Sequence, residues 1–161
     1  MQEIFAIINQ KGGVGKSTTA LALGCGLFDA GQRVLCIDLD AQGNLSYTLD
    51  ASEDIPTSLD ILTQRASIQD AIQSSWGPDV VSASPSLASA DLSITETGKE
   101  YRLREALEPV LSDYDYIVID TPPALGILTI NALSTATGAI IPAQADIYSL
   151  QGIGQLYGTL A

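Results

Sequence analysis

The sequence predicts an α/β fold in which a mainly parallel sheet is flanked by helices on both faces. Short, continuous apolar runs, typical of strands in the middle of a parallel sheet, alternate along the chain with longer helix-like segments. The first of these runs also ends at a glycine-rich turn that leads directly into a helix-like segment. A length of 161 residues fits one domain, so we expect residues 1–161 to form a single three-layer domain.

The N-terminal part gives the clearest pattern. Residues 4–8 predict a strand, residues 17–30 a helix, and residues 33–39 a second strand. Gly24 and Gly26 interrupt the helix, where each costs about 1 kcal/mol relative to alanine. We therefore expect both glycines to mark close packing between this helix and the sheet.

The middle of the chain carries the weakest pattern, with scattered serine, aspartate and proline. We expect short helical segments at residues 58–62 and 68–74, a short strand at residues 79–82 and a loop at residues 83–89.

The second half returns to a clear alternation of helices and strands. An amphipathic stripe of leucine and valine predicts one helix, and two further apolar runs predict buried strands. The expected elements are helices at residues 99–111, 127–133 and 147–161 and strands at residues 116–119 and 139–141.

The composition excludes several kinds of chemistry. The chain has no histidine, so it can form neither a Ser-His-Asp or Cys-His nucleophile pair nor a histidine-ligated metal site. Its 7 basic and 19 acidic residues give a net charge of −12, which disfavours non-specific binding of nucleic acids. The one small basic cluster, Lys99, Arg102 and Arg104, lies beside several glutamates, and we expect it to be a solvated helix surface.

Cysteine usage and the lack of targeting patterns favour a cytoplasmic location. Cys25 and Cys36 lie within apolar runs and predict buried, reduced thiols. The first residues lack the basic region and long apolar stretch of a signal peptide, and no run approaches the ~18 apolar residues of a membrane span. We therefore expect no membrane association.

A phosphate-binding loop is the central signal of the sequence. Residues 11–18 read KGGVGKST and lie between the first predicted strand and helix. Glycines let backbone N–H groups approach phosphate oxygens, and the following helix adds its positive end. Lys16 is expected to reach the β- and γ-phosphates, and the Ser17 hydroxyl to bind Mg²⁺. The strict motif has glycine where this chain has Gln10. The residues expected to bind the nucleotide are Lys11, Gly12, Gly13, Val14, Gly15, Lys16, Ser17 and Thr18.

Three aspartates follow buried strands, at the edge where parallel sheets bind ligands. Asp38 and Asp120 each end an apolar strand, which is the setting of a carboxylate that holds Mg²⁺ through water. Asp40 lies two residues beyond Asp38, where a carboxylate can orient or deprotonate an attacking water. The alternative role for Asp40 is that of a turn-forming residue.

Three ordered motifs together resemble one known family. They are NQKGGVGKST at residues 9–18, DLDAQGN at residues 38–44 and DYIVIDTPP at residues 115–123. They look like the deviant Walker A, A′ and B motifs of ParA/Soj-type partitioning ATPases, within the wider ParA/MinD family of P-loop NTPases. Residues 125–133 and 141–146 are also similar to the family.

The resemblance implies a Mg²⁺-dependent ATPase that acts in chromosome or plasmid partitioning. Lys11 would be the signature lysine, which reaches the partner's phosphates in an ATP-bound sandwich homodimer. Lys16 would hold phosphates within its own chain, and Asp40 would position the attacking water. A ParB-like partner would stimulate hydrolysis. Ala41 stands where proline is common in the family.

The resemblance also implies that residues 1–161 are the N-terminal portion of a longer ParA-like domain. Relatives continue past Ala161 with further strands and helices, part of the adenine pocket and basic residues that bind DNA. We therefore expect non-specific DNA binding and association with the nucleoid only in the intact protein. Two alternatives stay open: a MinD-like ATPase that binds a membrane surface, and a truncated, non-enzymatic nucleotide-binding fragment.

Overall fold

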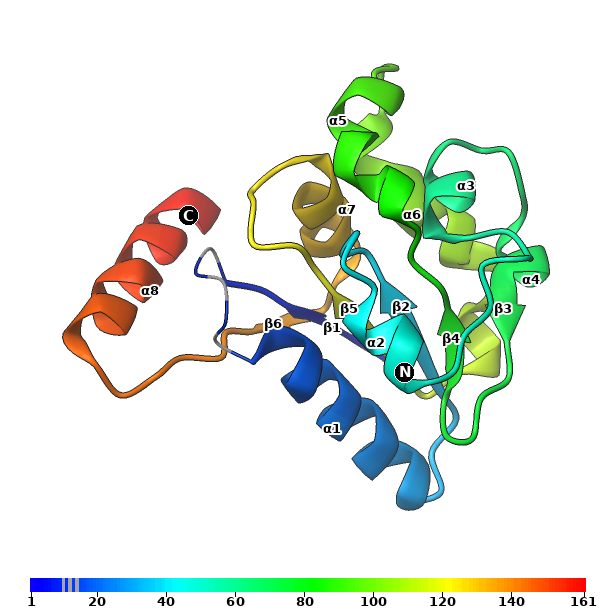
Figure 1. The fold of residues 1–161 in the computed structure, drawn as a ribbon, viewed down its shortest axis with the longest axis horizontal. Helices are drawn as coiled ribbons and strands as arrows, with labels where there is room; N and C mark the ends of the chain where they lie inside the picture. The colour runs from blue at the N-terminus through cyan, green and yellow to red at the C-terminus, as the bar shows by residue number, and fades with distance from the viewer. Residues whose placement is uncertain (10, 12, 14) are drawn as a thin grey trace.

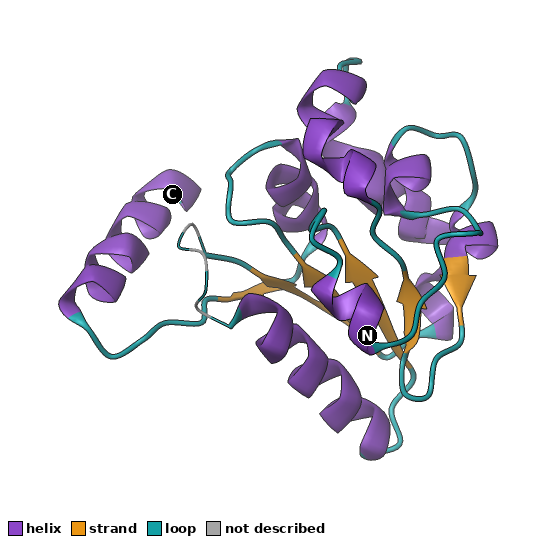
Figure 2. Ribbon diagram, viewed as in Figure 1, coloured by secondary structure: helices purple, strands orange, loops and turns teal. Residues whose placement is uncertain are grey.

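The computed structural model describes residues 1–9, 11, 13 and 15–161. It shows one twisted sheet between two layers of helices, as the alternating pattern predicts (Figures 1 and 2). The predicted three-layer α/β architecture is therefore confirmed.

The sheet has six strands in the order β3-β4-β2-β5-β1-β6. All neighbouring strands pair in parallel except β3, which is antiparallel to β4 at the edge of the sheet. The strands are β1 (Glu3–Ile7), β2 (Val34–Asp38), β3 (Ile72–Gln73), β4 (Asp79–Val81), β5 (Tyr116–Asp120) and β6 (Gly138–Ile140).

Both faces of the sheet are buried because successive side chains point to opposite sides. On one face, Ile7, Cys36 and Val118 pack in a core under α1 (Lys16–Asp29) and α2 (Asn44–Thr48). On the other face, side chains such as Ile37 and Ile119 join a larger core. The helices that contribute to this second core are α3 (Ser58–Leu62), α4 (Ile68–Ala71), α5 (Ala90–Ser93), α6 (Arg102–Leu107) and α7 (Ile127–Thr135).

The last helix, α8 (Ile147–Leu160), lies beyond the β6 edge of the sheet (Figure 1). Leu156 joins the larger core, while Ile147, Tyr148, Leu150 and Tyr157 are exposed. No helix within the described part of the chain is long and apolar enough to cross a membrane.

Several local predictions were wrong. The helix expected at residues 99–111 is α-helical only over Arg102–Leu107, and 3₁₀ turns precede and follow it (Lys99–Tyr101 and Glu108–Asp113). Pro109 accounts for the early end, because proline has no N–H for the helical ladder. The helix expected to reach residue 74 ends at Ala71, where the chain enters β3.

Two short elements were missed altogether, and one expected loop has regular structure. The helices α2 and α5 have five and four residues, too few to show a helical period. The segment expected to be a loop contains a 3₁₀ turn over Pro85–Ser89.

The two helix glycines differ in their packing. A Cβ atom added at Gly24 would lie 2.5 Å from the Sγ atom of Cys36, so Gly24 does mark close packing of α1 on β2. A Cβ atom at Gly26 would meet nothing within 4 Å, so the expectation for that residue was wrong. Cys36 is buried, as expected, but Cys25 is only partly buried.

Candidate nucleotide-binding site

The register of three adjacent strands brings the sequence motifs together. Asp120 at the end of β5 pairs with Ile7 of β1 on one side and with Asp38 of β2 on the other. The backbone N–H of Leu39 donates to the carbonyl of Asp120 at 2.9 Å, which joins the chain beyond β2 to the end of β5. The loop after β1 and the two aspartates therefore meet at one edge of the sheet.

The loop enters α1 through left-handed glycines. Gly13 has φ 73° and Gly15 has φ 84°, a conformation that side chains with a Cβ atom rarely adopt. Lys16 is the first residue of α1, so the free N–H groups and positive end of this 14-residue helix lie at the loop. Gly12 and Val14, which were also predicted to bind the nucleotide, lie outside the described residues.

An open cleft of about 440 Å³ lies against the loop and the start of α1. It holds most of the predicted nucleotide-binding residues and Asp40, together with three residues for which the motifs predict no role: Gln42, Asn44 and Pro123. The full lining is Gly13, Gly15, Lys16, Ser17, Thr18, Asp40, Gln42, Asn44 and Pro123.

Asp120 has the features of a carboxylate that binds near a cation. Its side chain is fully buried, and its Oδ2 atom accepts a hydrogen bond from Ser17 Oγ at 2.6 Å. Its buried Oδ1 atom accepts no hydrogen bond from any residue that the structure describes. Burial raises the pKa of Asp120 to about 7, and the nearby carboxylates of Asp38 and Asp40 add to this effect, whereas the Ser17 hydrogen bond and the charge of Lys16 oppose it. A buried acceptor oxygen without a donor fits a hydrated divalent cation.

Asp38 is also fully buried, but protein donors satisfy both of its oxygens. Its Oδ2 atom accepts hydrogen bonds from the backbone N–H and the hydroxyl of Ser46, at 2.9 and 2.7 Å. Its Oδ1 atom accepts one from the N–H of Asp40 at 3.0 Å. Burial raises the pKa of Asp38, and these hydrogen bonds oppose the shift. Asp38 therefore fixes the start of the turn that carries Asp40 and the helix α2.

Lys16 is an almost buried cation that lines the cleft. It is 7% exposed, and its Nζ atom donates to the carbonyl of Lys11 at 3.3 Å. Burial lowers the pKa of Lys16, while the negative charges of Asp120 and Asp40 oppose this shift. A bound phosphate would supply an anionic partner in direct contact with this lysine.

Asp40 lines the cleft and also builds a turn. Its Oδ1 atom accepts a hydrogen bond from the N–H of Gln42 at 3.0 Å, and its carbonyl accepts one from Gly43 at 2.9 Å. The turn-forming role is therefore present, and the side chain still borders the cleft.

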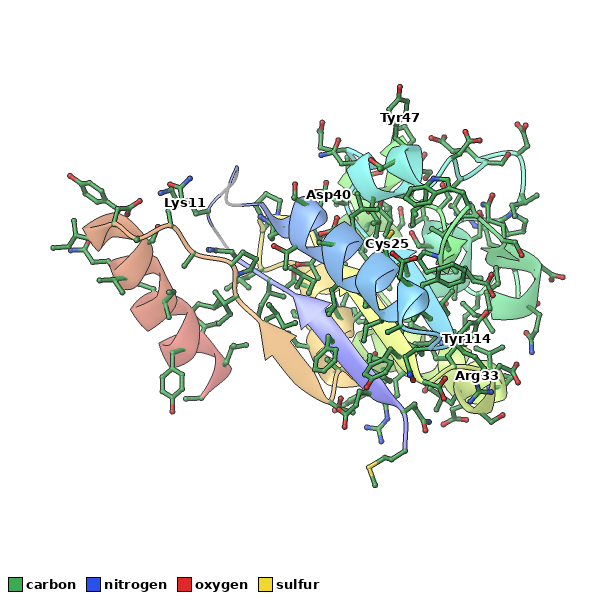
Figure 3. All side chains as sticks on the ribbon, turned by 90° about the horizontal axis from the view of Figure 1, so that it is seen from below. Lys11, Cys25, Arg33, Asp40, Tyr47 and Tyr114 are labelled. Atoms are coloured by element: carbon green, nitrogen blue, oxygen red, sulfur yellow. The ribbon has the colours of Figure 1, made fainter. Side chains whose placement is uncertain are left out.

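Lys11 lies on the side of the loop that faces α8, away from Asp40 (Figure 3). Its Nζ atom is 3.7 Å from Oδ2 of Asp146, and both side chains are partly exposed. Asp146 also caps α8 by accepting a hydrogen bond from the N–H of Ser149 at 2.7 Å. The amide of Asn9 donates to the carbonyl of Pro142 at 2.6 Å, which ties the start of the loop to the segment before α8.

Sequence reasoning assigned no role to Ser46, which holds Asp38, or to Asp146, which pairs with Lys11. Asp146 is distant in the sequence from Lys11. Ser46 contacts Asp38 across a turn and a short helix that the sequence did not predict. The small basic cluster also differs from expectation, because the side chain of Arg102 is largely buried and its guanidinium pairs with the carboxylate of Glu96 at 2.6 Å. The cluster with Lys99 and Arg104 is therefore not a fully solvated surface.

Comparison with known sequences agrees with the motif pattern. A family model described as an AAA domain matches residues 2–161. The sporulation initiation inhibitor protein Soj of Bacillus subtilis is 44% identical over 165 residues, and the match covers 99% of this chain and 65% of Soj. The chromosome partitioning protein ParA of Myxococcus xanthus is 41% identical over 162 residues, with 98% of this chain and 57% of that protein covered. The chain thus spans about three-fifths of the length of these curated relatives.

Solved structures show the same fold at high similarity. Cobyrinic acid a,c-diamide synthase of Mycobacterium smegmatis, crystallised with ADP and magnesium, superposes with a TM-score of 0.92 at 36% identity. The match covers 99% of this chain and 66% of that one. A plasmid partition protein of Borrelia burgdorferi gives a TM-score of 0.91 at 27% identity, over 98% of this chain and 73% of that one. The chain belongs to the AAA-domain family, and its relatives include ParA/Soj-type partitioning ATPases.

Proposed function

We propose that this chain is the nucleotide-binding part of a Mg²⁺-dependent ParA-type ATPase that acts as a switch in the partitioning of a chromosome or plasmid. Lys16, Ser17 and Asp120 meet at the start of α1, where the buried Oδ1 atom of Asp120 accepts no hydrogen bond from the described residues, and this arrangement is the main support for the proposal. The synthase described above was crystallised with ADP and magnesium, which supports the same ligands for this chain.

The loop and the start of α1 would hold the phosphates of ATP. Left-handed glycines let backbone N–H groups approach phosphate oxygens, and the helix adds its positive end. Lys16 would pair with phosphate oxygens, and their negative charge would stabilise the buried ammonium group. Lys11, Gly12, Gly13, Val14, Gly15 and Thr18 complete the proposed phosphate-binding set.

Ser17, Asp38 and Asp120 would hold Mg²⁺, which when bound neutralises negative charge on the β- and γ-phosphate oxygens. Ser17 Oγ can keep its hydrogen bond to Asp120 while its lone pairs remain free to bind the ion. The Oδ1 atom of Asp120, which has no donor within the part of the chain that the structure describes, can accept a hydrogen bond from a metal-bound water. Asp38, whose oxygens are already occupied by protein donors, would act mainly by fixing the turn to Asp40.

Asp40 would orient or deprotonate the attacking water. Its carboxylate borders the cleft, and the hydrogen bond from Gln42 fixes one of its oxygens. A fixed carboxylate beside the γ-phosphate supplies the positioning that phosphoryl transfer requires.

The resemblance to ParA proteins supports a dimer that forms around ATP. Lys11 would leave Asp146 and reach the phosphates of the partner chain, and a ParB-like protein would stimulate hydrolysis. Non-specific DNA would bind the intact protein, which would act in the cytoplasm and on the nucleoid. With 7 basic residues against 19 acidic ones, this chain alone should bind DNA poorly.

Lys16→Ala tests the proposed phosphate site. Loss of a charge-assisted hydrogen bond costs roughly 1.5–3 kcal/mol, so affinity for a fluorescent ATP analogue should fall by about ten-fold or more. Lys99→Ala, which removes a lysine that does not line the cleft, should leave the affinity unchanged. Equal affinity of the Lys16→Ala variant and the parent protein would contradict the proposal.

A further inference from the structure

One loop connects the end of β5 to the start of α7 and borders the nucleotide cleft. It comprises residues 121–126, between Asp120 and Ile127. Pro123, in the middle of this loop, lines the cleft. We refer to residues 121–126 as the Pro123 loop. Its position relative to the cleft depends on the groups that hold its two ends.

Two threonine hydroxyl groups join the Pro123 loop to its neighbours. Thr121 is fully buried, and its Oγ1 atom donates to the carbonyl of Ile7 at 2.7 Å. This contact fixes the start of the loop to the strand that precedes the phosphate loop. Thr129 Oγ1 donates to the carbonyl of Ala124 at 2.7 Å, which fixes the later part of the loop to the first turn of α7. A displacement of α7 should therefore displace the loop.

Asp91, an exposed residue of α5, holds the start of α7. Its Oδ1 atom accepts a hydrogen bond from the backbone N–H of Ile127 at 2.9 Å. This N–H has no acceptor within its own helix because it lies in the first turn, and Ile127 is buried. The negative charge of Asp91 also interacts favourably with the positive end of this nine-residue helix. Asp91 thus caps α7 from a different helix.

Gly126 allows the carboxylate of Asp91 to approach the backbone. A Cβ atom added at Gly126 would lie 2.8 Å from Oδ2 and 3.0 Å from Oδ1 of Asp91. The backbone of Gly126 is extended, with φ −90° and ψ −166°, so its conformation does not by itself require glycine. The nearby carboxylate is what excludes a larger residue. The hydrogen bond and the close approach are two separate observations that couple Asp91 to the end of the Pro123 loop.

We propose that Asp91 is a positioning residue for ATP hydrolysis, which it supports by capping α7 and so holding the Pro123 loop at the cleft. This step rests on the proposed function. Asp91 is not among the described residues that line the cleft, so it acts through Ile127 and the loop. Lys16 and the phosphate loop would still bind nucleotide if the Pro123 loop moved. Because reaction requires stricter geometry than binding, loss of Asp91 should lower kcat more than it lowers nucleotide affinity.

Asp91→Ala should lower kcat for Mg²⁺-ATP hydrolysis by about five- to ten-fold, and it should change the Kd for a fluorescent ATP analogue by less than about two-fold. Asp91→Asn keeps an acceptor oxygen, so it should restore kcat to within about three-fold of the parent value. Asp70→Ala is the matched control, because Asp70 is also an exposed aspartate in the first turn of a helix and accepts a hydrogen bond from Ser67 Oγ at 2.7 Å. A parallel loss of kcat and affinity, or an equal loss of kcat in Asp70→Ala, would overturn the inference.

A double-mutant cycle tests the coupling of Asp91 to Gly126. Gly126→Ala should displace the carboxylate and lower kcat about as much as Asp91→Ala does. The combined variant should lose no more activity than either single variant, because the new methyl group no longer meets a carboxylate. If the two losses multiply in the combined variant, the residues act independently and the inference is wrong.

Hydrogen exchange measures the role of Asp91 without hydrolysis. Asp91→Ala should accelerate backbone amide exchange in residues 121–130 by about ten-fold and leave α1 unchanged. Unchanged exchange in residues 121–130 would contradict the capping role. If the parent protein hydrolyses ATP and Asp91→Ala does so at the parental rate, the positioning role fails alone. Absence of turnover in the parent protein would refute the proposed function, and the exchange rates would still decide whether Asp91 holds the loop.

Discussion

The carboxylates of Asp38 and Asp120 occupy paired positions on neighbouring strands, yet they are equipped for different tasks. Three hydrogen bonds already satisfy Asp38, whereas one oxygen of Asp120 is buried without a donor among the residues that the structure describes. A fully hydrogen-bonded carboxylate fixes its neighbours in place, and an unsatisfied one stabilises a cation or its water. Asp120 is therefore the residue on which Mg²⁺ affinity should depend most.

Asp120→Asn should lower the affinity for Mg²⁺ of the nucleotide-bound protein by roughly 10- to 100-fold, the range typical of residues that orient a metal's ligands. The amide keeps the size of the side chain but loses its negative charge. Titration of Mg²⁺ into the protein with a fluorescent ADP analogue measures this effect. Asp70→Asn, at an exposed position distant in sequence, serves as the control, and an unchanged Mg²⁺ dependence of Asp120→Asn would refute the assignment.

Much of the site could be predicted at the level of residues because each predicted residue follows an apolar strand or starts a helix. The ends of strands and the starts of helices determine where such residues lie. Lys16, Ser17 and Asp120 could therefore be expected at one edge of the sheet. The contact of Ser46 with Asp38 could not be predicted, because it depends on a short helix that carries no periodic signal. The pairing of Lys11 with Asp146 joins residues far apart in the sequence and has no local pattern.

Among the elements, α1 shows how one glycine controls the packing of a layer. Gly24 lets the helix approach Cys36 of β2 more closely than a side chain would allow, whereas Gly26 on the same helix faces open space. Sequence alone assigns the same cost to both glycines, because helix propensity does not contain information about the partner strand.

Substitution of these two glycines should have opposite effects on stability. Gly24→Ala should lower the free energy of unfolding by about 1–3 kcal/mol, because the new methyl group overlaps the Cys36 thiol. Gly26→Ala should raise it by roughly 0.5–1 kcal/mol, since alanine favours the helix and meets no neighbour. Urea unfolding of both variants checks the pair, and destabilisation of similar size at the two positions would contradict this packing.

The starts of β2 and β5 are joined by Arg33 and Asp115. The guanidinium donates to both carboxylate oxygens, at 2.8 and 3.2 Å, and the N–H of Arg33 donates to the same carboxylate at 2.9 Å. These hydrogen bonds lower the pKa of Asp115 to about 2. They hold the two central strands in the register that places Asp38 beside Asp120.

The contribution of Asp115 to the free energy of unfolding should decrease as the pH falls. A carboxyl group whose folded pKa lies below its unfolded value of about 3.9 stabilises the fold above that value, and this stabilisation is lost as pH falls toward about 2. Asp115→Asn should therefore be less stable than the parent at neutral pH, and the difference should shrink between about pH 4 and 2. Urea unfolding across this range tests the expectation, with Asp29→Asn as an exposed control. A difference that stayed constant with pH would rule out the ion pair as its source.

Elements with long apolar runs could be predicted, and the short polar ones could not. The strands β1, β2 and β5 and the helix α1 follow from continuous apolar stretches bounded by glycine or charge. The segment between β2 and β4 depends on tertiary contacts, such as the Ser52–Gln73 pair, that no local pattern encodes. The proline that ends α6 was visible in the sequence and should have limited the predicted helix.

The whole molecule combines a loop for anions with a strongly acidic surface. Its net charge of −12 would repel free nucleotides, so Lys16 and the positive end of α1 must supply local attraction at the cleft. The molecule is thus equipped to bind phosphate at the cleft although its overall charge is negative.

The role of Asp40 can be tested by comparing Mg²⁺-dependent ATP hydrolysis by the protein and by its Asp40→Ala variant, with nucleotide binding measured in the same samples. We expect slow turnover in the parent protein, a loss of turnover of about 100-fold or more in Asp40→Ala, and nearly unchanged ATP binding. Asp29→Asn should hydrolyse ATP at the parental rate. Turnover by Asp40→Ala equal to that of the parent would contradict the assignment of Asp40 and with it the proposed mechanism.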